Sequence, residues 1–280
     1  MTTMGFSLLN CNSTIGSVNF WKNLPKPFFV LAPMDDVTDT VFRQIVAGVA
    51  PADVAVTEFA SADGFVHVKG RDSVERRLRV DPDEQANSVP LVAQIWGGNP
   101  DHYRTMTREL AGRGLFAGID INMGCPEKGI VKRGCCGGLI KSENWQLAAD
   151  IIAATKEGAG DLPVSVKTRI GVNSIATDEW AANLLRQGLA ALTIHGRTVK
   201  EMSKVPAHWD EIAKVVKIRD QIAPETTIIG NGDIDNRGDG LKRIKQSGVD
   251  GAMIGRGVLR DIQAFAAKEH NMTPADRVAL

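Results

Sequence analysis

The chain alternates between short apolar runs and longer amphipathic segments. Apolar runs rich in β-branched residues are typical of buried strands, and eight of them recur, at 28–32, 53–57, 89–95, 117–122, 163–168, 190–195, 226–231 and 250–255. Segments with helical spacing lie between them, at 38–48, 101–114, 143–160, 177–188, 208–222 and 236–248. Strands that alternate with helices form parallel βαβ units. Eight units predict an α/β fold, the closed (β/α)8 TIM barrel, with an open doubly wound sheet as the alternative.

One connection departs from this regular alternation. The segment 60–88 is longer than a single helix requires, so we expect an inserted turn or loop there.

Unusual polar and glycine motifs follow every predicted strand. Barrel active sites lie at the C-terminal ends of the strands, and these ends carry 32-APMDDVTD-39, Glu58, Gln94, 122-NMGCP-126, 167-KTR-169, 195-HGRT-198, 230-GNGDI-234 and 255-GRG-257. Side chains alternate along a strand. The alternation directs Asp120 and Asn122 toward the barrel axis, and it puts Lys167 and Arg169 on one face. The alternative is that these are solvated charges at strand ends.

The last two of these motifs are typical of a phosphate site. Barrels commonly hold phosphate in the loops after the seventh and eighth strands, and here those loops contain several glycines and Arg256. No GxGxxG motif joins a strand to a helix, which favours a mononucleotide over a dinucleotide. Gln94 and Lys167 would then reach the edge of a flat heterocycle. In the alternative, Lys167 forms a structural ion pair with Asp120 or Glu58.

Composition and charge restrict the class of protein. The 280 residues contain 33 Lys and Arg against 33 Asp and Glu, so zero net charge gives no support to nucleic-acid binding. Four cysteines are too few for a disulfide scaffold, which favours reduced thiols and a cytoplasmic location. No long apolar stretch predicts a membrane span or a secretion signal.

Three of the cysteines lie in 121-INMGCPEKGIVKRGCCGGLI-140. Their spacing does not match a zinc site, so we expect no metal. A disulfide between Cys135 and Cys136 would be strained, and we interpret both as small residues of a glycine-rich turn. Cys125 follows the fourth strand between Gly124 and Pro126, where a protonated thiol can act as a general acid. A purely structural role for Cys125 is the alternative.

Together these motifs resemble those of the tRNA-dihydrouridine synthases. The similarity runs from Trp21 to Phe265 through LAPMDDVTDTVFR, TEF, VAQIWG, DINMGCP, VKTRIG, LTIHGRT, NGDI and IGRG. It implies an FMN-dependent oxidoreductase that reduces the 5,6 double bond of particular uridines in tRNA, with NADPH as the electron source. It also implies that Cys125 protonates C5 after hydride passes from flavin N5 to C6.

The resemblance also implies binding roles for individual residues. The positions that match flavin contacts are Pro33, Met34, Gln94, Lys167, His195, Asn231, Gly232, Asp233, Gly255 and Arg256. Asn122, Arg169 and Arg197 match positions that face the uridine or its backbone. A uridine reduced at this site must be turned out of its stack, which costs least in a single-stranded loop.

Two short motifs depart from the family pattern. Asp36 stands where glycine is common, and GCCGGLI replaces GAGAALI, so two extra thiols near Cys125 predict sensitivity to oxidation.

The domain organisation follows from the same comparison. We expect a leader at 1–20, the FMN-binding barrel at 21–268, and at 269–280 the opening of a truncated helical tRNA-binding domain. This arrangement predicts a monomer that binds flavin well and tRNA weakly. The other functions considered are a dihydroorotate dehydrogenase-like enzyme acting on a free pyrimidine and an RNA-binding barrel without catalysis.

Overall fold

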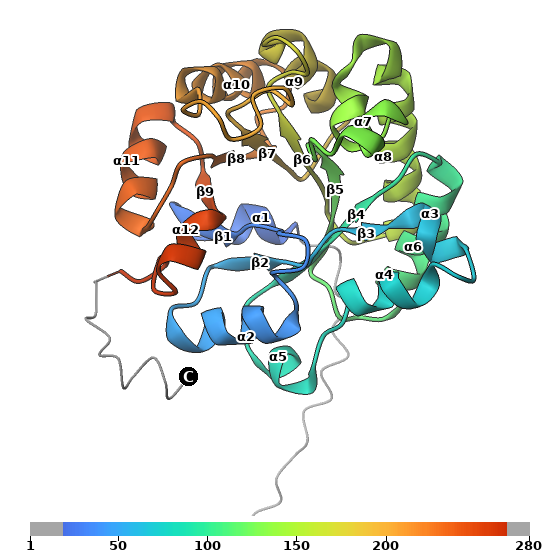
Figure 1. The fold of residues 1–280 in the computed structure, drawn as a ribbon. Helices are drawn as coiled ribbons and strands as arrows, with labels where there is room; N and C mark the ends of the chain where they lie inside the picture. Colours follow the sequence, from blue (N-terminus) through green and yellow to red (C-terminus); the bar gives the residue numbers. More distant parts are fainter. Residues whose placement is uncertain (1–18, 268–280) are drawn as a thin grey trace, which may run out of the picture.

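A closed barrel of parallel strands forms the centre of the molecule (Figure 1). The computed structural model describes residues 19–267. Within them the strands are β1 Phe28–Leu31, β2 Val54–Val56, β3 Ala60–Ser61, β4 Leu91–Trp96, β5 Gly118–Met123, β6 Val164–Arg169, β7 Ala191–His195, β8 Thr227–Asn231 and β9 Gly251–Ile254. β1 pairs with both β2 and β9, and β2 also pairs with β4. These pairings close the sheet, so the predicted TIM barrel is confirmed and the open sheet is wrong.

Six helices of the outer layer match the predicted helical segments. They are α2 Thr40–Val49, α6 Pro100–Gly112, α8 Trp145–Ala159, α9 Thr177–Leu185, α10 Trp209–Ile222 and α11 Arg237–Ser247, and they surround the strands in Figure 1. Local sequence sets several of their ends. The side chains of Asp39, Asn99 and Asn236 accept backbone N–H bonds at three N-termini. Gly248 ends α11 at φ 76°, where glycine has no steric penalty.

The connection between β3 and β4 differs from the sequence prediction. It forms three short helices, α3 Ala62–Val66, α4 Arg71–Arg77 and α5 Pro82–Ala86, so the expected turn or loop is wrong for most of the segment. A buried ion pair attaches this insertion to α2. Arg43 Nε donates to Glu84 Oε1 at 2.5 Å, and Thr40 Oγ1 donates to Glu84 Oε2 at 2.7 Å. Such long-range contacts stabilise helices that are too short to persist alone.

Apolar side chains fill the barrel at its amino end. Trp21, from the short helix α1 Phe20–Asn23, is 2% exposed and belongs to a buried cluster with Phe28, Val30 and Val92. A second and larger cluster lies between the strands and the outer helices, and it contains Ile119 and Ile121. These isoleucines therefore face outward, as the alternation in β5 predicts. The carboxyl end of the barrel interior is left to polar residues.

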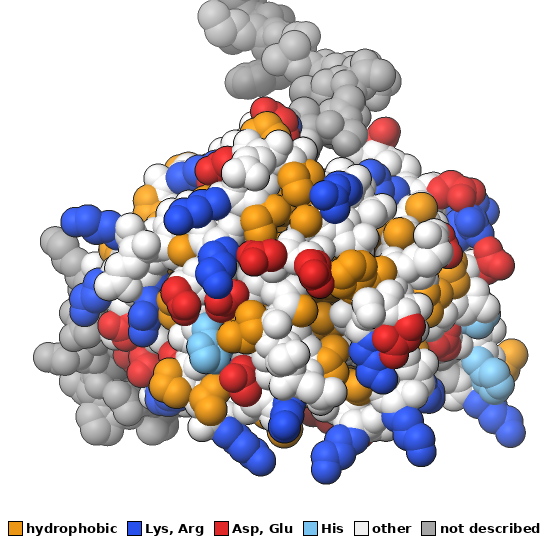
Figure 2. Space-filling view, turned by 90° about the horizontal axis from the view of Figure 1, so that it is seen from above, with side chains coloured by type: hydrophobic (Ala, Val, Ile, Leu, Met, Phe, Trp, Pro, Cys, Tyr) orange, Lys and Arg blue, Asp and Glu red, His pale blue; other side chains and the backbone are white. Residues whose placement is uncertain are grey.

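The remaining elements lie close to that polar end. They are α7 Lys128–Lys132, the two 3-10 turns η1 Cys136–Ile140 and η2 Ser142–Asn144, and α12 Arg256–Arg260. Acidic and basic side chains are interspersed on the helical flank seen in Figure 2. Within residues 19–267 no helix combines the length and apolar composition that a membrane crossing needs. Most of the predicted leader and the whole of 269–280 lie outside the described residues.

Candidate active site

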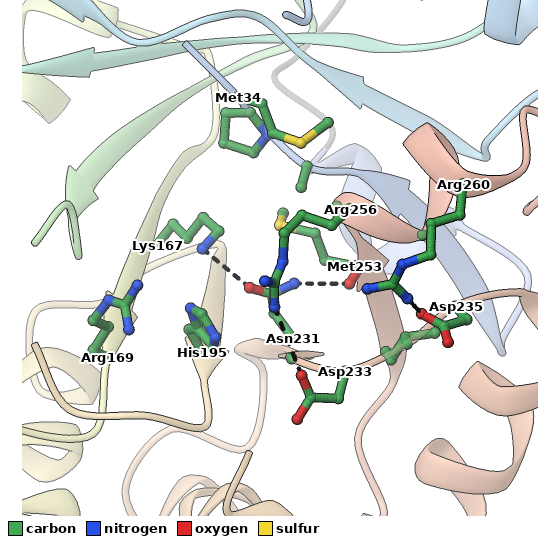
Figure 3. Close-up of a pocket in the computed structure, with 16 residues that line it drawn as sticks. Met34, Lys167, Arg169, His195, Asn231, Asp233, Asp235, Met253, Arg256 and Arg260 are labelled. Atoms are coloured by element: carbon green, nitrogen blue, oxygen red, sulfur yellow. Dashed lines mark hydrogen bonds and ion pairs between the residues drawn. The ribbon is translucent and has the colours of Figure 1, made fainter. Parts of the chain in front are cut away.

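A cavity of about 430 Å³ opens at the carboxyl ends of β1, β6, β7, β8 and β9 (Figure 3). Nine of the ten predicted flavin-contacting positions line it, namely Pro33, Met34, Lys167, His195, Asn231, Gly232, Asp233, Gly255 and Arg256. Arg169, predicted to face the substrate, lines it as well. Strand register explains the convergence. Arg169 pairs with His195, and His195 pairs with Asn231, so three chain-distant residues form one row.

The cavity has further lining residues outside the ten positions predicted to contact flavin. They are Ala32, Ile234, Asp235, Met253 and Arg260, together with Gly257 of the predicted phosphate loop. Two of them carried a usable signal. Arg260 lies four residues after Arg256, which is one helical turn, and Met253 lies two residues before Gly255 on a strand. Arg260 also forms an ion pair with Asp235 (Figure 3).

Lys167 contacts an amide in the cavity. Its Nζ donates to Asn231 Oδ1 at 3.2 Å, and Asn231 Nδ2 donates to the Met253 carbonyl at 2.8 Å. Among the described residues no carboxylate lies within ion-pairing distance of Lys167, so the alternative of a structural pair with Asp120 or Glu58 is wrong. Desolvation, with the Arg169 charge adding to it, lowers the pKa of Lys167 to about 8.

His195 is held as a neutral ring. Desolvation is the main cause that lowers its pKa well below the usual value, and the charges of Lys167 and Arg169 act in the same direction. The neutral ring lies with Nε2 3.2 Å from Arg197 Nη1, so Nε2 is the acceptor. The ring therefore adds no positive charge to the cavity at neutral pH.

Arg197 lies behind the cavity rather than in its lining. It is 3% exposed, and its Nη2 donates at 2.6 Å to both carboxylate oxygens of Asp233, which does line the cavity. Asp233 has φ 51° and follows Gly232 at φ 125°. The buried guanidinium therefore holds this turn in a left-handed conformation, which aspartate adopts more readily than most residues other than glycine.

Gln94 and Asn122 lie beneath the Cys125 loop and outside the cavity lining. Asn122 Nδ2 donates to Gln94 Oε1 at 3.1 Å. Asn122 Oδ1 accepts from the backbone N–H groups of Gly124 and Cys125, each at 3.0 Å. Gln94 Nε2 in turn donates to Asp120 Oδ2 at 2.7 Å. This buried chain of bonds fixes the backbone that carries the thiol, and it shows that Asp120 and Asn122 point into the barrel.

Cys125 is partly buried at the end of β5. Burial is the largest cause that raises the pKa of its thiol, while the nearby Arg169 charge opposes the rise. Arg169 Nε donates to the Gly124 carbonyl at 2.8 Å, so the same cation braces the loop. The thiol consequently retains its proton at neutral pH, which is the state that a general acid needs.

The other two described cysteines are free and more deeply buried. Cys135 is 5% exposed, and Cys136 is fully buried at φ 47° in the first residue of η1. Burial raises the pKa of both thiols. Since thiolates are the reactive form, this burial does not favour the expected sensitivity to oxidation. The fourth cysteine, Cys11, lies outside the described residues.

The backbone conformation of Asp36 explains why glycine is common at this position in the family pattern. Its backbone has φ 56°, its N–H donates to Glu58 Oε1 at 2.7 Å, and its carboxylate pairs with Arg76 at 2.9 Å. Asp35 pairs with Arg77 at 2.9 Å in the same corner. The three carboxylates have oxygens within 4.8 Å of one another. The expectation that no metal is bound stays a prediction.

Comparison with solved structures gives the same architecture. The chain is similar to morphinone reductase in complex with tetrahydroNAD, with a TM-score of 0.58, 13% identity and 89% coverage of each chain. It is also similar to a variant of NCR from Zymomonas mobilis, with a TM-score of 0.57, 15% identity and the same coverage. Identities this low support the barrel fold alone.

Sequence relatives are much closer. A probable tRNA-dihydrouridine synthase 2 from Bacillus subtilis (strain 168) is 48% identical over 256 residues, which cover 90% of this chain and 76% of that protein. A probable tRNA-dihydrouridine synthase from Staphylococcus aureus (strain COL) is 47% identical over 263 residues, covering 94% and 77%. The family model described as dihydrouridine synthase matches residues 30–278. The chain therefore belongs to the dihydrouridine synthase family.

Proposed function

We propose that this chain reduces the 5,6 double bond of uridines in tRNA to give dihydrouridine, as a flavin-dependent enzyme. Family membership over residues 30–278 and the named relatives support this activity. The observation that carries the proposal is the pairing of a polar, cationic cavity with a protonated thiol on a braced loop beside it. The free-pyrimidine alternative is not favoured, since the relatives are named for tRNA.

We propose FMN as the flavin, and the lining of the cavity supports this choice. A Cβ added at Gly255 would meet Ala32 Cβ at 3.5 Å and Met34 Sδ at 3.9 Å, both in the lining, so the missing side chain leaves space for a ligand. Arg256 and Arg260 provide positive charge at the α12 end, and the first N–H groups of a helix have no intrahelical partner. These features suit one phosphate group. When bound, FMN supplies the hydride that reduces uridine C6, with NADPH as the reductant of the flavin.

Lys167, Asn231 and His195 would contact the flavin ring system. Lys167, with a pKa of about 8, is mostly protonated at pH 7 and can stabilise negative charge on a bound ring. Its bond to Asn231 Oδ1 fixes the position of the ammonium group. Neutral His195 offers a hydrogen bond without a competing charge. The roles of Pro33, Met34, Gln94, Gly232 and Asp233 in flavin binding are proposed on the same resemblance.

Cys125 would supply the second hydrogen of the reduction. Saturating the 5,6 bond adds a hydride equivalent at C6 and a proton at C5, and the Cys125 thiol donates that proton. The resulting thiolate lies near the Arg169 charge, which lowers its energy, and it regains a proton from solvent. Asn122 and Arg169 hold the loop through backbone bonds, which makes them positioning residues for this thiol. Arg197 contributes to the site indirectly, because it donates a hydrogen bond to Asp233, which lines the cavity.

The tRNA must present the uridine unstacked. A base inside a helix cannot reach the end of a barrel, so the substrate is a nucleotide turned out of a single-stranded loop.

We further propose that the protein is a cytoplasmic monomer with its flavin domain at 21–268. None of these three assignments affects the chemistry above.

An anaerobic single-turnover experiment tests this function. The purified protein is reduced, unmodified tRNA is added, and flavin reoxidation is followed by absorbance, with dihydrouridine measured by mass spectrometry. We expect the flavin of the wild-type protein to be reoxidised by tRNA. In Cys125→Ala the rate of reoxidation should be at least about 100-fold lower. Cys135→Ala, which removes a neighbouring buried thiol, serves as the matched control. Normal product formation in Cys125→Ala would exclude the thiol as the proton donor, and purification without flavin would contradict the cofactor assignment.

A further inference from the structure

The loops that follow β6 and β7 form a paired wall beside Cys125. We define residues 170–176 and 197–204 as the β6/β7 rim. Its two segments exchange backbone hydrogen bonds, from Ile170 N–H to the Arg197 carbonyl at 3.3 Å, from Val199 N–H to Gly171 at 2.9 Å, and from Lys200 N–H to Val172 at 2.9 Å. Gly171 also bridges to Ile175. The rim is therefore an ordered extension of two barrel strands rather than a loose connection.

Side chains also stabilise the second segment of the rim, residues 197–204. Glu201 Oε2 accepts from the Thr198 backbone N–H at 2.7 Å, and its Oε1 lies 3.0 Å from His208 Nε2. Arg169 Nη1 donates to the Thr198 and Met202 carbonyls at 3.2 and 3.0 Å. The second segment of the rim is thus held by both a carboxylate and a buried guanidinium.

Two large apolar side chains project from this ordered rim. Ile175 is 44% exposed and Met202 is 43% exposed. Met202 also has φ 52°, a strained conformation for a residue other than glycine. Backbone strain and exposed apolar surface both occur often at functional sites. Their coincidence at one place therefore indicates a function for this surface.

The rim is directly connected to the proposed proton donor. Arg169, which bonds the rim, also donates through Nε to the Gly124 carbonyl next to Cys125. A Cβ at Gly137 would lie 2.7 Å from Val199 Cγ2 and 2.9 Å from the Cys125 carbonyl oxygen, so rim and thiol loop are in close contact. A nucleotide whose base reaches Cys125 would therefore lie beside this surface.

Positive charge flanks the exposed apolar residues. Lys200 and Lys204 are both exposed and lie on either side of Met202 in the second rim segment. Neither has an ion-pair partner among the described residues. Lys and Arg side chains also project along the lower edge of Figure 2, which is the face turned toward the reader in Figure 1. A polyanion with apolar base faces is complementary to this combination.

We propose that the β6/β7 rim binds the single-stranded tRNA segment adjoining the uridine that is reduced. Met202 and Ile175 pack against the face of a neighbouring base or ribose, and Lys200 and Lys204 contact the phosphates on either side. The rigid backbone positions that nucleotide relative to Cys125. The inference rests on the proposed function for the identity of the RNA.

Equilibrium binding of unmodified tRNA, followed by fluorescence anisotropy, tests the rim independently of catalysis. Met202→Gly removes the side chain while glycine accepts φ 52° without strain. We expect its Kd to rise about 5- to 10-fold, since loss of one base contact has an effect of this order. Leu241→Ala on α11 removes a side chain of equal exposure, 43%, and should leave Kd unchanged.

Salt dependence tests the two lysines. The double variant Lys200→Ala/Lys204→Ala should weaken binding and reduce the slope of log Kd against log salt by about 1.4, the value for two phosphate contacts on a single strand. Lys217→Ala/Lys245→Ala removes two exposed lysines from the outer helices and serves as the charge-matched control. Equal Kd values and equal slopes for rim and control variants would overturn the proposal.

Catalysis distinguishes this proposal from the proposed function. Single-turnover reduction at saturating tRNA should be unchanged in the control Leu241→Ala, and Met202→Gly should lose much less rate than Cys125→Ala, because the rim does not donate the proton. If wild type fails to reduce tRNA, the proposed function fails, and the titrations still decide whether the rim binds RNA. If wild type reduces tRNA while rim variants bind it normally, only the rim proposal fails. Flavin content and melting temperature verify the fold of each variant.

Discussion

The two ends of the barrel interior are built on opposite physical principles. At the amino end Trp21, Phe28 and Val30 form a dry cluster that is at most 2% exposed. At the carboxyl end Lys167 of β6, Asn231 of β8 and other polar groups surround an open cavity. β8 has both roles, since Ile229 belongs to the dry cluster and Asn231 lines the cavity. Substitutions at the two ends should separate stability from function accordingly.

The largest effect on stability is expected at the closed end. Trp21→Ala removes a large buried side chain and leaves a void, which should lower the free energy of unfolding by about 3–5 kcal/mol. Urea denaturation measures the change. Flavin spectra and turnover of the molecules that remain folded should stay normal at low temperature. A loss of turnover that exceeds the loss of folded protein would show that the two ends are not separable.

At the open end we expect a pH-dependent cost of burying Lys167. Its pKa falls from 10.5 to about 8 on folding, so the unfolded chain binds more protons between these values and stability from this group rises with pH. The full penalty, up to about 3 kcal/mol, acts below pH 8. Lys167→Met removes it. Denaturation of both flavin-free proteins at pH 7 and pH 10 should show wild type gaining relative to the variant; an unchanged difference would contradict the lowered pKa.

A smaller effect is expected where the interior supports the Cys125 loop. Asn122→Ala removes the acceptor of two backbone N–H bonds and should slow uridine reduction about tenfold. Asn122→Asp retains that acceptor, so it should recover most of the rate. Single-turnover kinetics provide the measurement, with flavin affinity as the control. Equal defects in both variants would indicate loss of the Gln94 bond rather than of loop positioning.

The smallest effect on stability is expected at Asp36, in the loop that follows β1 at the open end. Asp36→Gly relieves the conformation at φ 56° and removes an exposed ion pair with Arg76. Exposed pairs contribute little, and glycine increases the entropy of the unfolded chain, so the net change should stay within about 0.5 kcal/mol. Thermal unfolding measures it. A loss above 2 kcal/mol would mean that this corner is as tightly packed as the closed end.

Much of the fold and the cavity is readable in the sequence because local patterns specify it. The eight apolar runs become strands, and motifs at their ends converge because parallel strands end on one face. Nine of the ten positions predicted to contact flavin line the cavity for that reason. The exception, Gln94, is buried because two neighbours on β5 bond to its side chain. No spacing rule indicates that choice of partner.

Other features depended on contacts between distant segments. The pairing of Arg197 with Asp233 spans 36 residues, and the bond between Arg43 and Glu84 spans 41. The short helices between β3 and β4 depend on the second of these bonds, because helices so short do not persist alone. The paired rim beyond β6 and β7 depends on backbone bonds across 27 or 28 residues.

The sequence by itself determined the barrel, the end of it that carries the chemistry, and Cys125 as the candidate proton donor. Periodicity and strand-end motifs are local properties, and family resemblance adds the reaction. Only the tertiary structure decided which polar groups line the cavity, which brace the loops, and how burial shifts the pKa values of Lys167, His195 and Cys125. Desolvation and hydrogen-bond partners depend on atoms from several strands, and these meet only when the barrel closes.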